Sequence, residues 1–458
     1  MVTLRVMTRS PSPADSLLAR ASVPRYTSYP PANHFTPEVG PDRHARWIAS
    51  VDPDRPVSIY LHIPFCRRLC HFCACRTQGT RTDAPLDAYV KRLVTEIRRV
   101  AALLRHPQPA SAVHFGGGTP TILPPHLLRA IDAALRSSFD VLPDAEVSVE
   151  VDPMELDERR LDALASIGLT RASIGVQDFA DAVQSAIGRP QSFEATRAAA
   201  EGLRARGARS LNVDLIYGLP HQDAASLRAT LAHVDELVPD RVAIYGYAHV
   251  PQMARRQRLI PQDALPGPAE RLALFELARR LLLWAGYVPA GIDHFARPGD
   301  TLALAAQAGR LRRNFQGYTT DDARVLLGFG ASAISRFPQG HVQNAPASGA
   351  WAARIDEGRL ASVRGYALSS EDRCRGEIID RLMCDFAADV GGIAAAHGMT
   401  LAAFHATLER ILERFGPEVA VEAGHLRLTA SDGRFARLVC AEFDTFLAQK
   451  EAAYSRAI

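Results

Sequence analysis

The stretch VSIYLHIPFCRRLCHFCAC (57–75) decides how the sequence is interpreted. It opens with a β-branched, apolar run over 57–63, which predicts a buried strand. Directly after this run come Cys66, Cys70 and Cys73, spaced by three and then two residues. Thiolates are the usual ligands of iron-sulfur clusters, and three ligands on a cubane leave one iron open to chemistry. The stretch therefore predicts a cluster-binding loop after the first strand.

Zinc is the alternative occupant of such a loop. Structural zinc takes four ligands, commonly in CxxC pairs, and the sequence contains no second pair. Cys75 could supply a fourth thiolate to either metal. Its C-x-C spacing from Cys73, however, makes it difficult for both residues to bind neighbouring irons on one short loop. The spacing favours a cluster over zinc. The scattered Cys374, Cys384 and Cys440 are interpreted as small buried hydrophobic residues.

Composition and charge describe a soluble globular protein. The 458 residues are 47% apolar and 22% charged, enough for sizeable cores and two or three domains. With 53 basic and 50 acidic side chains the net charge is only +3, so no nucleic-acid partner is implied. The first thirty residues lack the apolar stretch of a signal peptide, and no apolar run is long enough to span a membrane. We expect a cytoplasmic protein.

From about residue 56, β-branched runs alternate with helical periods, which is typical of successive βα units. We expect strands at 57–63, 112–118, 146–152, 171–177, 210–218 and 241–250. We expect helices at 85–106, 124–138, 156–167, 192–206, 222–237 and 268–286. Six units are too few for a closed eightfold barrel. The pattern predicts an α/β fold with an open, partial (β/α)6 barrel.

Three regions follow from the changes in composition. Residues 1–55 are an N-terminal extension, and residues 56–360 hold the partial barrel. The loop-rich, aromatic stretch 287–345 is expected to form a lid or an extra layer of strands. Residues 361–458 predict amphipathic helices and a short hairpin, a mainly helical, winged-helix-like domain with little reason to bind DNA at this net charge.

Chemically useful residues lie just after the predicted strands, where parallel α/β folds place their sites. The glycines of GGGTP (116–120) allow a backbone to come close to a ligand. Glu150 ends the third strand, where packing alone does not explain a carboxylate, and it can accept hydrogen bonds from a ribose or an ammonium group. Gln177, Arg189 and Asp214 occupy corresponding ends or loops.

The cysteine loop after the first strand of a partial barrel resembles the signature of the radical S-adenosylmethionine (SAM) superfamily. The other motifs are similar to those of the oxygen-independent coproporphyrinogen III oxidase family. They are RYTSYP (25–30), YLHIPFC (60–66), GGGTPT (116–121), EVDP (150–153), GVQDF (175–179), DLIYGLP (214–220), YAHVP (247–251), DHFARP (293–298), NFQGYTT (314–320), SAIS (332–335) and FDTFLAQK (443–450). The resemblance covers nearly the whole chain.

The resemblance implies a 4Fe-4S cluster on Cys66, Cys70 and Cys73 and two bound molecules of SAM. The residues expected at these two molecules are Tyr60, Phe72, Gly117, Gly118, Thr119, Glu150, Gln177, Arg189, Asp214, Ala248 and Ile334. For Ala248 and Ile334, core packing is the alternative role. Cys75 is not expected to bind iron, because a fourth thiolate would close the site of the cosubstrate. It is either an inert thiol or a supporting group in catalysis.

The family's substrate is a flexible tetrapyrrole with four propionates, so its pocket requires cations and aromatic rings. The candidates are Arg25, Tyr26, Tyr29, His294, Arg297 and Tyr318. The N-terminal extension (1–55) is thus expected to contribute to the substrate site.

The implied activity belongs to an oxidoreductase of haem biosynthesis. Two propionates of coproporphyrinogen III would be decarboxylated oxidatively to vinyl groups without oxygen, giving protoporphyrinogen IX. A 5′-deoxyadenosyl radical would drive the reaction in a monomer served by a one-electron donor such as flavodoxin or ferredoxin. The alternatives are a haem chaperone and a radical methyltransferase that opens the haem ring. Ala74-Cys75 and RYTSYP (25–30) favour the oxidase over the chaperone.

Overall fold

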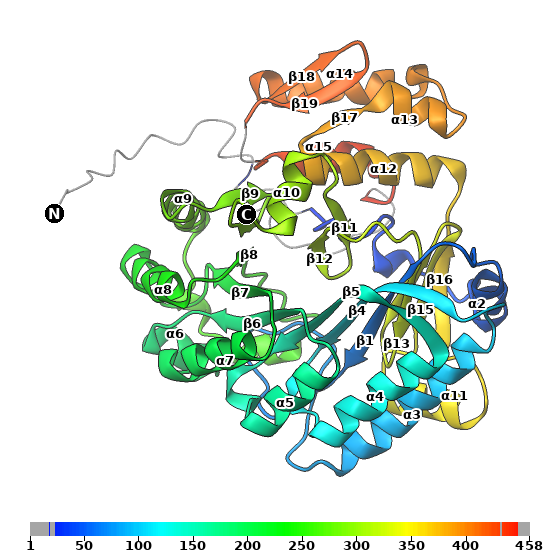
Figure 1. Cartoon of the computed structure of the whole chain (residues 1–458). Helices are drawn as coiled ribbons and strands as arrows, with labels where there is room; N and C mark the ends of the chain where they lie inside the picture. Colours follow the sequence, from blue (N-terminus) through cyan, green and yellow to red (C-terminus); the bar gives the residue numbers. More distant parts are fainter. Residues whose placement is uncertain (1–17, 19–22, 431–432, 448–458) are drawn as a thin grey trace.

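The computed structural model describes residue 18, residues 23–430 and residues 433–447. The other residues of the expected N-terminal extension, and residues 448–450 of FDTFLAQK, lie outside this part of the chain. Within it, twelve strands form one curved sheet, in the order β16-β15-β14-β13-β1-β4-β5-β6-β7-β8-β10-β9 (Figure 1). An α/β fold with an open, partial barrel is confirmed.

The centre of the sheet is parallel and consists of the six predicted strands. These are β1 (Val57–Ile63), β4 (Gln108–Gly117), β5 (Phe139–Val151), β6 (Arg171–Gln177), β7 (Ser210–Tyr217) and β8 (Arg241–Gly246). The predicted helices are also present, as α3 (Ala84–Ala101), α4 (Pro125–Ser138), α5 (Glu158–Ser166), α7 (Phe193–Ala205), α8 (Ala224–Leu237) and α9 (Pro268–Trp284). Figure 1 shows them along the outer side of the sheet.

Strands outside the six units extend the sheet at both edges. β13 (Leu326–Phe329) pairs with β1 as a further parallel strand, which the sequence did not predict. The antiparallel strands beyond it are β14 (Ile334–Phe337), β15 (Gly340–Asn344) and β16 (Ser362–Ala367), and those at the opposite edge are β10 (His294–Ala296) and β9 (Val288–Ala290). The region 287–345 thus supplies strands. The sheet also continues past residue 360, where the composition placed the end of the barrel.

The C-terminal part contains helices and a small sheet, above the open side of the large sheet in Figure 1. Its elements are α12 (Ser370–Asp385), β17 (Ala387–Asp389), α13 (Val390–Ala396), α14 (His405–Phe415), β18 (Val419–Glu422), β19 (His425–Leu428) and α15 (Ala436–Phe443). The shorter elements elsewhere are α2 (Pro41–Ala49), β2 (Phe65–Cys66), β3 (Gln78–Gly79), α6 (Asp181–Ala186), α10 (Thr301–Gln307), β11 (Arg312–Asn314), β12 (Gly317–Thr319) and α11 (Ser348–Asp356).

The N-terminal segment at residues 23–26 is hydrogen-bonded to the C-terminal residues Arg437 and Asp444. Tyr26 donates a hydrogen bond to Asp444 over 3.1 Å, and Arg437 of α15 donates to the carbonyl groups of Val23 and Pro24 over 2.6 and 3.1 Å. These contacts join segments that are more than 400 residues apart in the sequence. The N-terminal segment therefore lies between the sheet and the C-terminal helices, next to the open end of the barrel.

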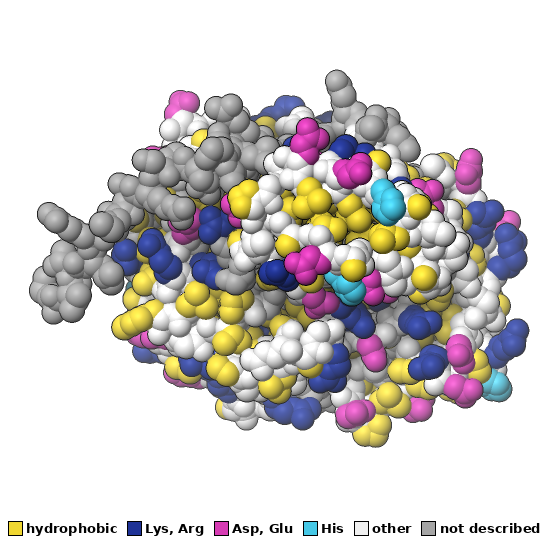
Figure 2. Space-filling model, turned by 90° about the horizontal axis from the view of Figure 1, so that it is seen from above, with side chains coloured by type: hydrophobic (Ala, Val, Ile, Leu, Met, Phe, Trp, Pro, Cys, Tyr) yellow, Lys and Arg dark blue, Asp and Glu magenta, His cyan; other side chains and the backbone are white. Residues whose placement is uncertain are grey.

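The surface carries both signs of charge. On the face seen in Figure 2, basic and acidic side chains are interspersed. Among the residues the structure describes, no helix is long and apolar enough to cross a membrane.

The buried carboxyl group of Glu96 links α3 to residues near β13 and β15 and to α11. It accepts hydrogen bonds from Gly330 N at 2.7 Å, Asn344 Nδ2 at 2.8 Å and Trp351 Nε1 at 3.1 Å, and it is 3% exposed. Burial raises the pKa of Glu96 to about 7, although these three hydrogen bonds act in the opposite direction. The folded state therefore holds this proton at pH values where the unfolded chain has released it.

We expect Glu96 to make the protein less stable as pH rises from about 5 to about 7.5, because the folded state binds more protons than the unfolded state in this range. The loss should approach about 3 kcal/mol. Glu96→Gln keeps the shape of the side chain without the titration. Urea unfolding at several pH values should show a smaller decline in the variant, and parallel declines would contradict the prediction.

Candidate active site

The cysteine loop and the carboxyl ends of the parallel strands enclose one cavity of about 180 Å³. The residues that line it and that the sequence singled out are Cys66, Cys70, Phe72, Cys73, Cys75, Gly117, Gly118, Thr119, Glu150, Gln177, Arg189 and Asp214. They come from β2, β4, β5, β6, β7 and the loops that follow these strands. The placement follows from the fold, because parallel strands end at the same edge of their sheet.

Backbone hydrogen bonds hold the cysteine loop in place. Thr80 N donates to the Cys66 carbonyl over 3.0 Å, and His71 N donates to the Ile187 carbonyl over 2.8 Å. From the loop after β8, Gln257 Nε2 donates to the Phe72 carbonyl over 2.7 Å. The loop is thus fixed by partners on both sides.

Hydrogen-bond donors surround the thiol groups. Thr119 Oγ1 lies 3.5 Å from the Cys66 sulfur, and Arg189 Nη1 lies 3.4 Å from the Cys70 sulfur. Burial raises the pKa of Cys66 to about 11 in the absence of metal. In the described part of the chain, no three His, Cys, Asp or Glu side chains converge on a single metal ion. In a cubane each thiolate binds a different iron, so three thiols around one cavity, with donors to their sulfurs, fit a cluster.

Cys75 lies at the mouth of the cavity and interacts with Cys73. The interaction between the two thiols lowers the pKa of Cys73 and raises the pKa of Cys75. That Cys75 does not bind iron stays a prediction.

The glycine turn at the end of β4 packs directly on the cysteine loop. Gly118 N and Thr119 N donate to the carbonyl groups of Ile63 and Phe65 over 2.8 and 2.9 Å. A Cβ atom on Gly118 would lie 2.6 Å from the Phe65 oxygen and 3.0 Å from the Cys66 sulfur. Gly117 has a φ of +117°, which disfavours any other residue. The glycines are required for the close approach of the turn to the cysteine loop.

The Glu150 carboxylate is oriented by β4. It accepts a hydrogen bond from Gly117 N at 2.9 Å and lies 3.4 Å from His114 Nε2. Burial acts to raise the pKa of Glu150, but His114 and the Gly117 amide outweigh it and leave the pKa below its ordinary value. Glu150 is therefore a fixed negative charge that faces the cavity.

Arg189 adds a positive charge to the wall of the cavity. Its guanidinium group donates to the Gly175 carbonyl over 2.8 Å and lies 3.5 Å from the Asp152 carboxylate. Its Nε is buried and has no hydrogen-bond partner in the structure. A Cβ on Gly175 would approach the guanidinium to 3.2 Å. The side chain is thus held in position with one donor unsatisfied.

The remaining polar residues complete the wall. Asp214 accepts hydrogen bonds from Ser173 Oγ at 2.7 Å and Asn212 Nδ2 at 2.8 Å, and burial raises its pKa. Gln177 ends β6 with a φ of +68°, an unusual conformation for a residue other than glycine. Such strain is concentrated at binding sites.

Three of the predicted contact residues lie elsewhere. Tyr60 lines an adjoining cavity, where its ring stacks on His114 at a centroid distance of 5.8 Å. Ala248 follows β8, and its carbonyl accepts a hydrogen bond from Gln257 at 3.0 Å. Ile334 begins β14. Ala248 and Ile334 are not among the residues that line the cysteine cavity, and their contacts with a cosubstrate stay predictions.

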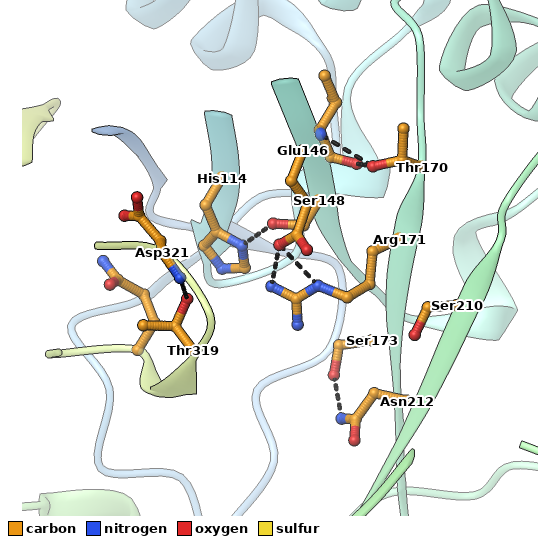
Figure 3. A network of polar contacts seen from close by, with 12 residues as sticks. His114, Glu146, Ser148, Thr170, Arg171, Ser173, Ser210, Asn212, Thr319 and Asp321 are labelled. Atoms are coloured by element: carbon orange, nitrogen blue, oxygen red, sulfur yellow. Dashed lines mark hydrogen bonds and ion pairs between the residues drawn. The ribbon is translucent and has the colours of Figure 1, made fainter. Parts of the chain in front are cut away.

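The cavity beside Tyr60 fills the polar interior of the barrel and measures about 270 Å³. Inward positions alternate along each strand, so His114, Ser148 and Arg171 stand side by side on β4, β5 and β6. Figure 3 shows the resulting contacts, with His114 Nδ1 at 2.5 Å from Ser148 Oγ and Arg171 Nε at 2.9 Å from Glu146. Glu150, Ser173 and Asp214 line both cavities, which therefore adjoin.

Several residues of the site were not predicted. Asp152, buried within the EVDP motif, lies within 3.5 Å of Arg68 and Arg189, and its place after a strand could have indicated a role. Arg256 donates to Thr77 Oγ1 over 2.6 Å from the loop after β8. No local signal in the sequence marks Arg256, because only the tertiary fold brings that loop to the cysteines.

The residues predicted to contact the substrate line three different cavities, except for Arg297. Arg25 and His294 line a third cavity, and Tyr318 and His294 line the barrel interior. Tyr26 and Tyr29 line a cavity beside the C-terminal helices. Arg297 lies over the ring of Tyr287, 4.8 Å from its centroid, and donates to the Pro239 carbonyl over 3.2 Å. Arg297 has a packing role in this structure.

Comparison with known proteins agrees with this geometry. Residues 60–234 match the family model of the radical SAM superfamily. The oxygen-independent coproporphyrinogen III oxidase of Paracoccus denitrificans is 52% identical over 426 residues, which cover 93% of this chain and 94% of that protein. The enzyme of the same name from Escherichia coli is 40% identical over 94% of each chain.

A solved structure of coproporphyrinogen III oxidase from Escherichia coli, described as a radical SAM enzyme, superimposes with a TM-score of 0.88 at 39% identity. The match covers 92% of this chain and 98% of that one. The resemblance read from the sequence motifs is confirmed over nearly the full length. The chain belongs to the oxygen-independent coproporphyrinogen III oxidase family of the radical SAM superfamily.

Proposed function

We propose that this protein converts coproporphyrinogen III to protoporphyrinogen IX without oxygen, by oxidative decarboxylation of two propionates to vinyl groups. The observation that carries the proposal is the cavity in which three thiol groups face Glu150 and Arg189 at the carboxyl edge of the sheet. The similarity to relatives that carry this activity in their name, over more than nine-tenths of the chain, supports the reaction.

Each group around the cavity has a role in this proposal. Cys66, Cys70 and Cys73 hold a 4Fe-4S cluster, which together with SAM supplies a 5′-deoxyadenosyl radical when both are bound. Arg189 binds a carboxylate through its planar fork of donors. Glu150 accepts hydrogen bonds from the cosubstrate's ribose or ammonium group.

Substrate turnover requires removal of a hydrogen atom from the β-carbon of a propionate. Loss of carbon dioxide and transfer of one electron to an external one-electron acceptor then leave a vinyl group, and the sequence is repeated on a second propionate. The protein's contribution is orientation and the exclusion of water and oxygen, for which the polar walls around Asp214 and Glu150 inside the barrel are suited.

The finer features of the proposal rest on the family resemblance. They comprise two molecules of SAM, with Phe72 near the second and with Ala248 and Ile334 as further contact residues, and a one-electron donor such as flavodoxin or ferredoxin. The proposal further includes that the protein is a cytoplasmic monomer and that it binds neither nucleic acid nor membranes. The division into residues 1–55, 56–360 with the lid region 287–345, and a winged-helix-like part over 361–458 belongs to the same proposal.

Anaerobic incubation of the reduced, cluster-loaded protein with SAM and coproporphyrinogen III tests the reaction. We expect two molecules of carbon dioxide and two of 5′-deoxyadenosine for each divinyl product, measured by mass spectrometry and chromatography. An intact cluster without vinyl product would contradict the proposal and favour the haem-chaperone alternative. Protein without SAM is the control.

A further inference from the structure

A third cavity, of about 370 Å³, lies between the end of β8 and the C-terminal helix α15. Cys75 lines both this cavity and the cysteine cavity, so the two adjoin. Tyr245 and His294 line it together with the barrel interior. A ligand in this third cavity is therefore next to both the cluster loop and the barrel interior. Three of the cavity's arginines, Arg313, Arg434 and Arg437, lie outside the motifs quoted from the sequence.

The lining of the cavity is strongly basic. Four arginines line it, Arg25, Arg313, Arg434 and Arg437, against one carboxylate, Asp293, which lies 2.7 Å from His294 Nδ1. Arg434 has its own ion pair, 3.4 Å from Glu276. Arg25, Arg313 and Arg437 come from the N-terminal segment, β11 and α15, three segments that only the tertiary fold brings together.

The hydrogen bonds described for Arg25 and Arg313 are to neutral carbonyl oxygens. Arg25 donates to Gly246 over 2.7 Å, and Arg313 donates to Tyr26 and to Arg25, each over 3.2 Å. Carbonyl groups orient a guanidinium group but do not neutralise its charge. Arg313 Nη1 is moreover buried without a hydrogen-bond partner. A buried donor without an acceptor is costly unless a ligand supplies one.

The arginines are close enough to affect one another. Burial, together with the charges of Arg25 and Arg313, lowers the pKa of Arg437 to about 10. Like charges gathered in a partly buried cavity oppose folding, and a bound anion would relieve this repulsion. The other walls carry the rings of Tyr217, Tyr245 and Phe315, which suit the flat pyrrole units of a large ligand.

We infer that Arg25, Arg313 and Arg437 form a carboxylate-binding site that anchors propionates of the tetrapyrrole substrate beside the cluster loop. The identity of this ligand rests on the proposed function. The N-terminal segment and the C-terminal helix complete the substrate pocket, and the propionates held there fix the ring while another propionate meets the radical. Guanidinium groups suit this role because their paired donors match a carboxylate.

Binding of coproporphyrin III, the fluorescent oxidised form of the substrate, to the cluster-loaded protein tests the inference. The variants are Arg313→Gln and Arg25→Gln, and the matched control is Arg129→Gln, an exposed arginine on α4. The tetramethyl ester of the porphyrin keeps the ring but lacks the carboxylates. We expect a tenfold or greater rise in Kd for the acid in both test variants, no rise in the control, and an unchanged Kd for the ester.

Equal acid affinity in Arg313→Gln, Arg25→Gln and the control would overturn the inference. An equal loss of acid and ester binding would also overturn it, because the arginines would then only support the wall. If a thermal melt shows that Arg313→Gln does not fold, the Kd values of Arg25→Gln alone test the inference. Arg25 is exposed, so its replacement should leave the protein folded. Arginine-dependent binding without vinyl product would refute the proposed function alone, and vinyl product with unchanged Kd values would refute the inference alone.

Discussion

The Cys70→Ser variant is expected to lose the iron-sulfur absorbance and to form no 5′-deoxyadenosine. Cys70 is 7% exposed, and its sulfur lies 3.4 Å from the guanidinium group of Arg189, so the site is built around a thiolate at this position. A serine hydroxyl does not ionise at neutral pH and is a poor ligand for iron-sulfur clusters. Anaerobic absorption spectra, iron content and chromatography of the nucleoside products measure the effect.

Cys75→Ser is the matched control for this prediction. Cys75 lies two residues after Cys73 and is not among the three expected cluster ligands, so its replacement should leave the cluster absorbance in place. Deoxyadenosine formation at the normal rate in Cys70→Ser would show that the ligand assignment is wrong. Loss of the cluster in Cys75→Ser would instead identify Cys75 as a ligand.

Glu150→Gln is expected to reduce 5′-deoxyadenosine formation by about two orders of magnitude while the cluster remains. The carboxylate accepts a hydrogen bond from Gly117 and faces His114, and the amide would keep its shape but lose its charge. A hydrogen bond to a charged group contributes about 1.5 to 3 kcal/mol, and each 1.4 kcal/mol corresponds to a factor of about ten in rate. The measurement is the initial rate with dithionite as reductant.

Glu194→Gln on α7 is the control, because Glu194 is an exposed glutamate away from the cavity. Its rate should equal that of the unaltered protein. If Glu150→Gln loses the cluster absorbance together with the rate, the carboxylate supports the loop and not the cosubstrate. A rate within a factor of about two of the control would remove Glu150 from the binding site altogether.

The regular part of the fold was predictable because its signals are local. The six parallel strands and their helices are marked by β-branched runs and helical periods of sufficient length. β13 (Leu326–Phe329) was missed because its four residues include a glycine and form too short a run to distinguish. Strands were expected within 287–345 as one alternative, but their individual bounds were not predictable, since each antiparallel strand there is three to five residues long.

The site was partly predictable for a related reason. Residues that end parallel strands, such as Gly117, Glu150 and Gln177, meet at one edge of the sheet whatever the details of packing. The position of Tyr60 in the adjoining barrel interior follows from the inward register of β1, which a single sequence does not reveal. Ala248 and Ile334 carry no polar signal that would distinguish ligand contact from packing.

What the sequence by itself determined is the chemistry of the cysteine loop and the succession of βα units, because both depend on residues close together in the chain. Only the tertiary structure decided which residues from distant parts of the chain contact this loop and one another. Thr77 meets Arg256 across nearly 180 residues. Arg437 reaches the carbonyl of Val23 from the other end of the chain. Such contacts depend on the closing of long loops and the packing of distant elements, and no local pattern of residues encodes them.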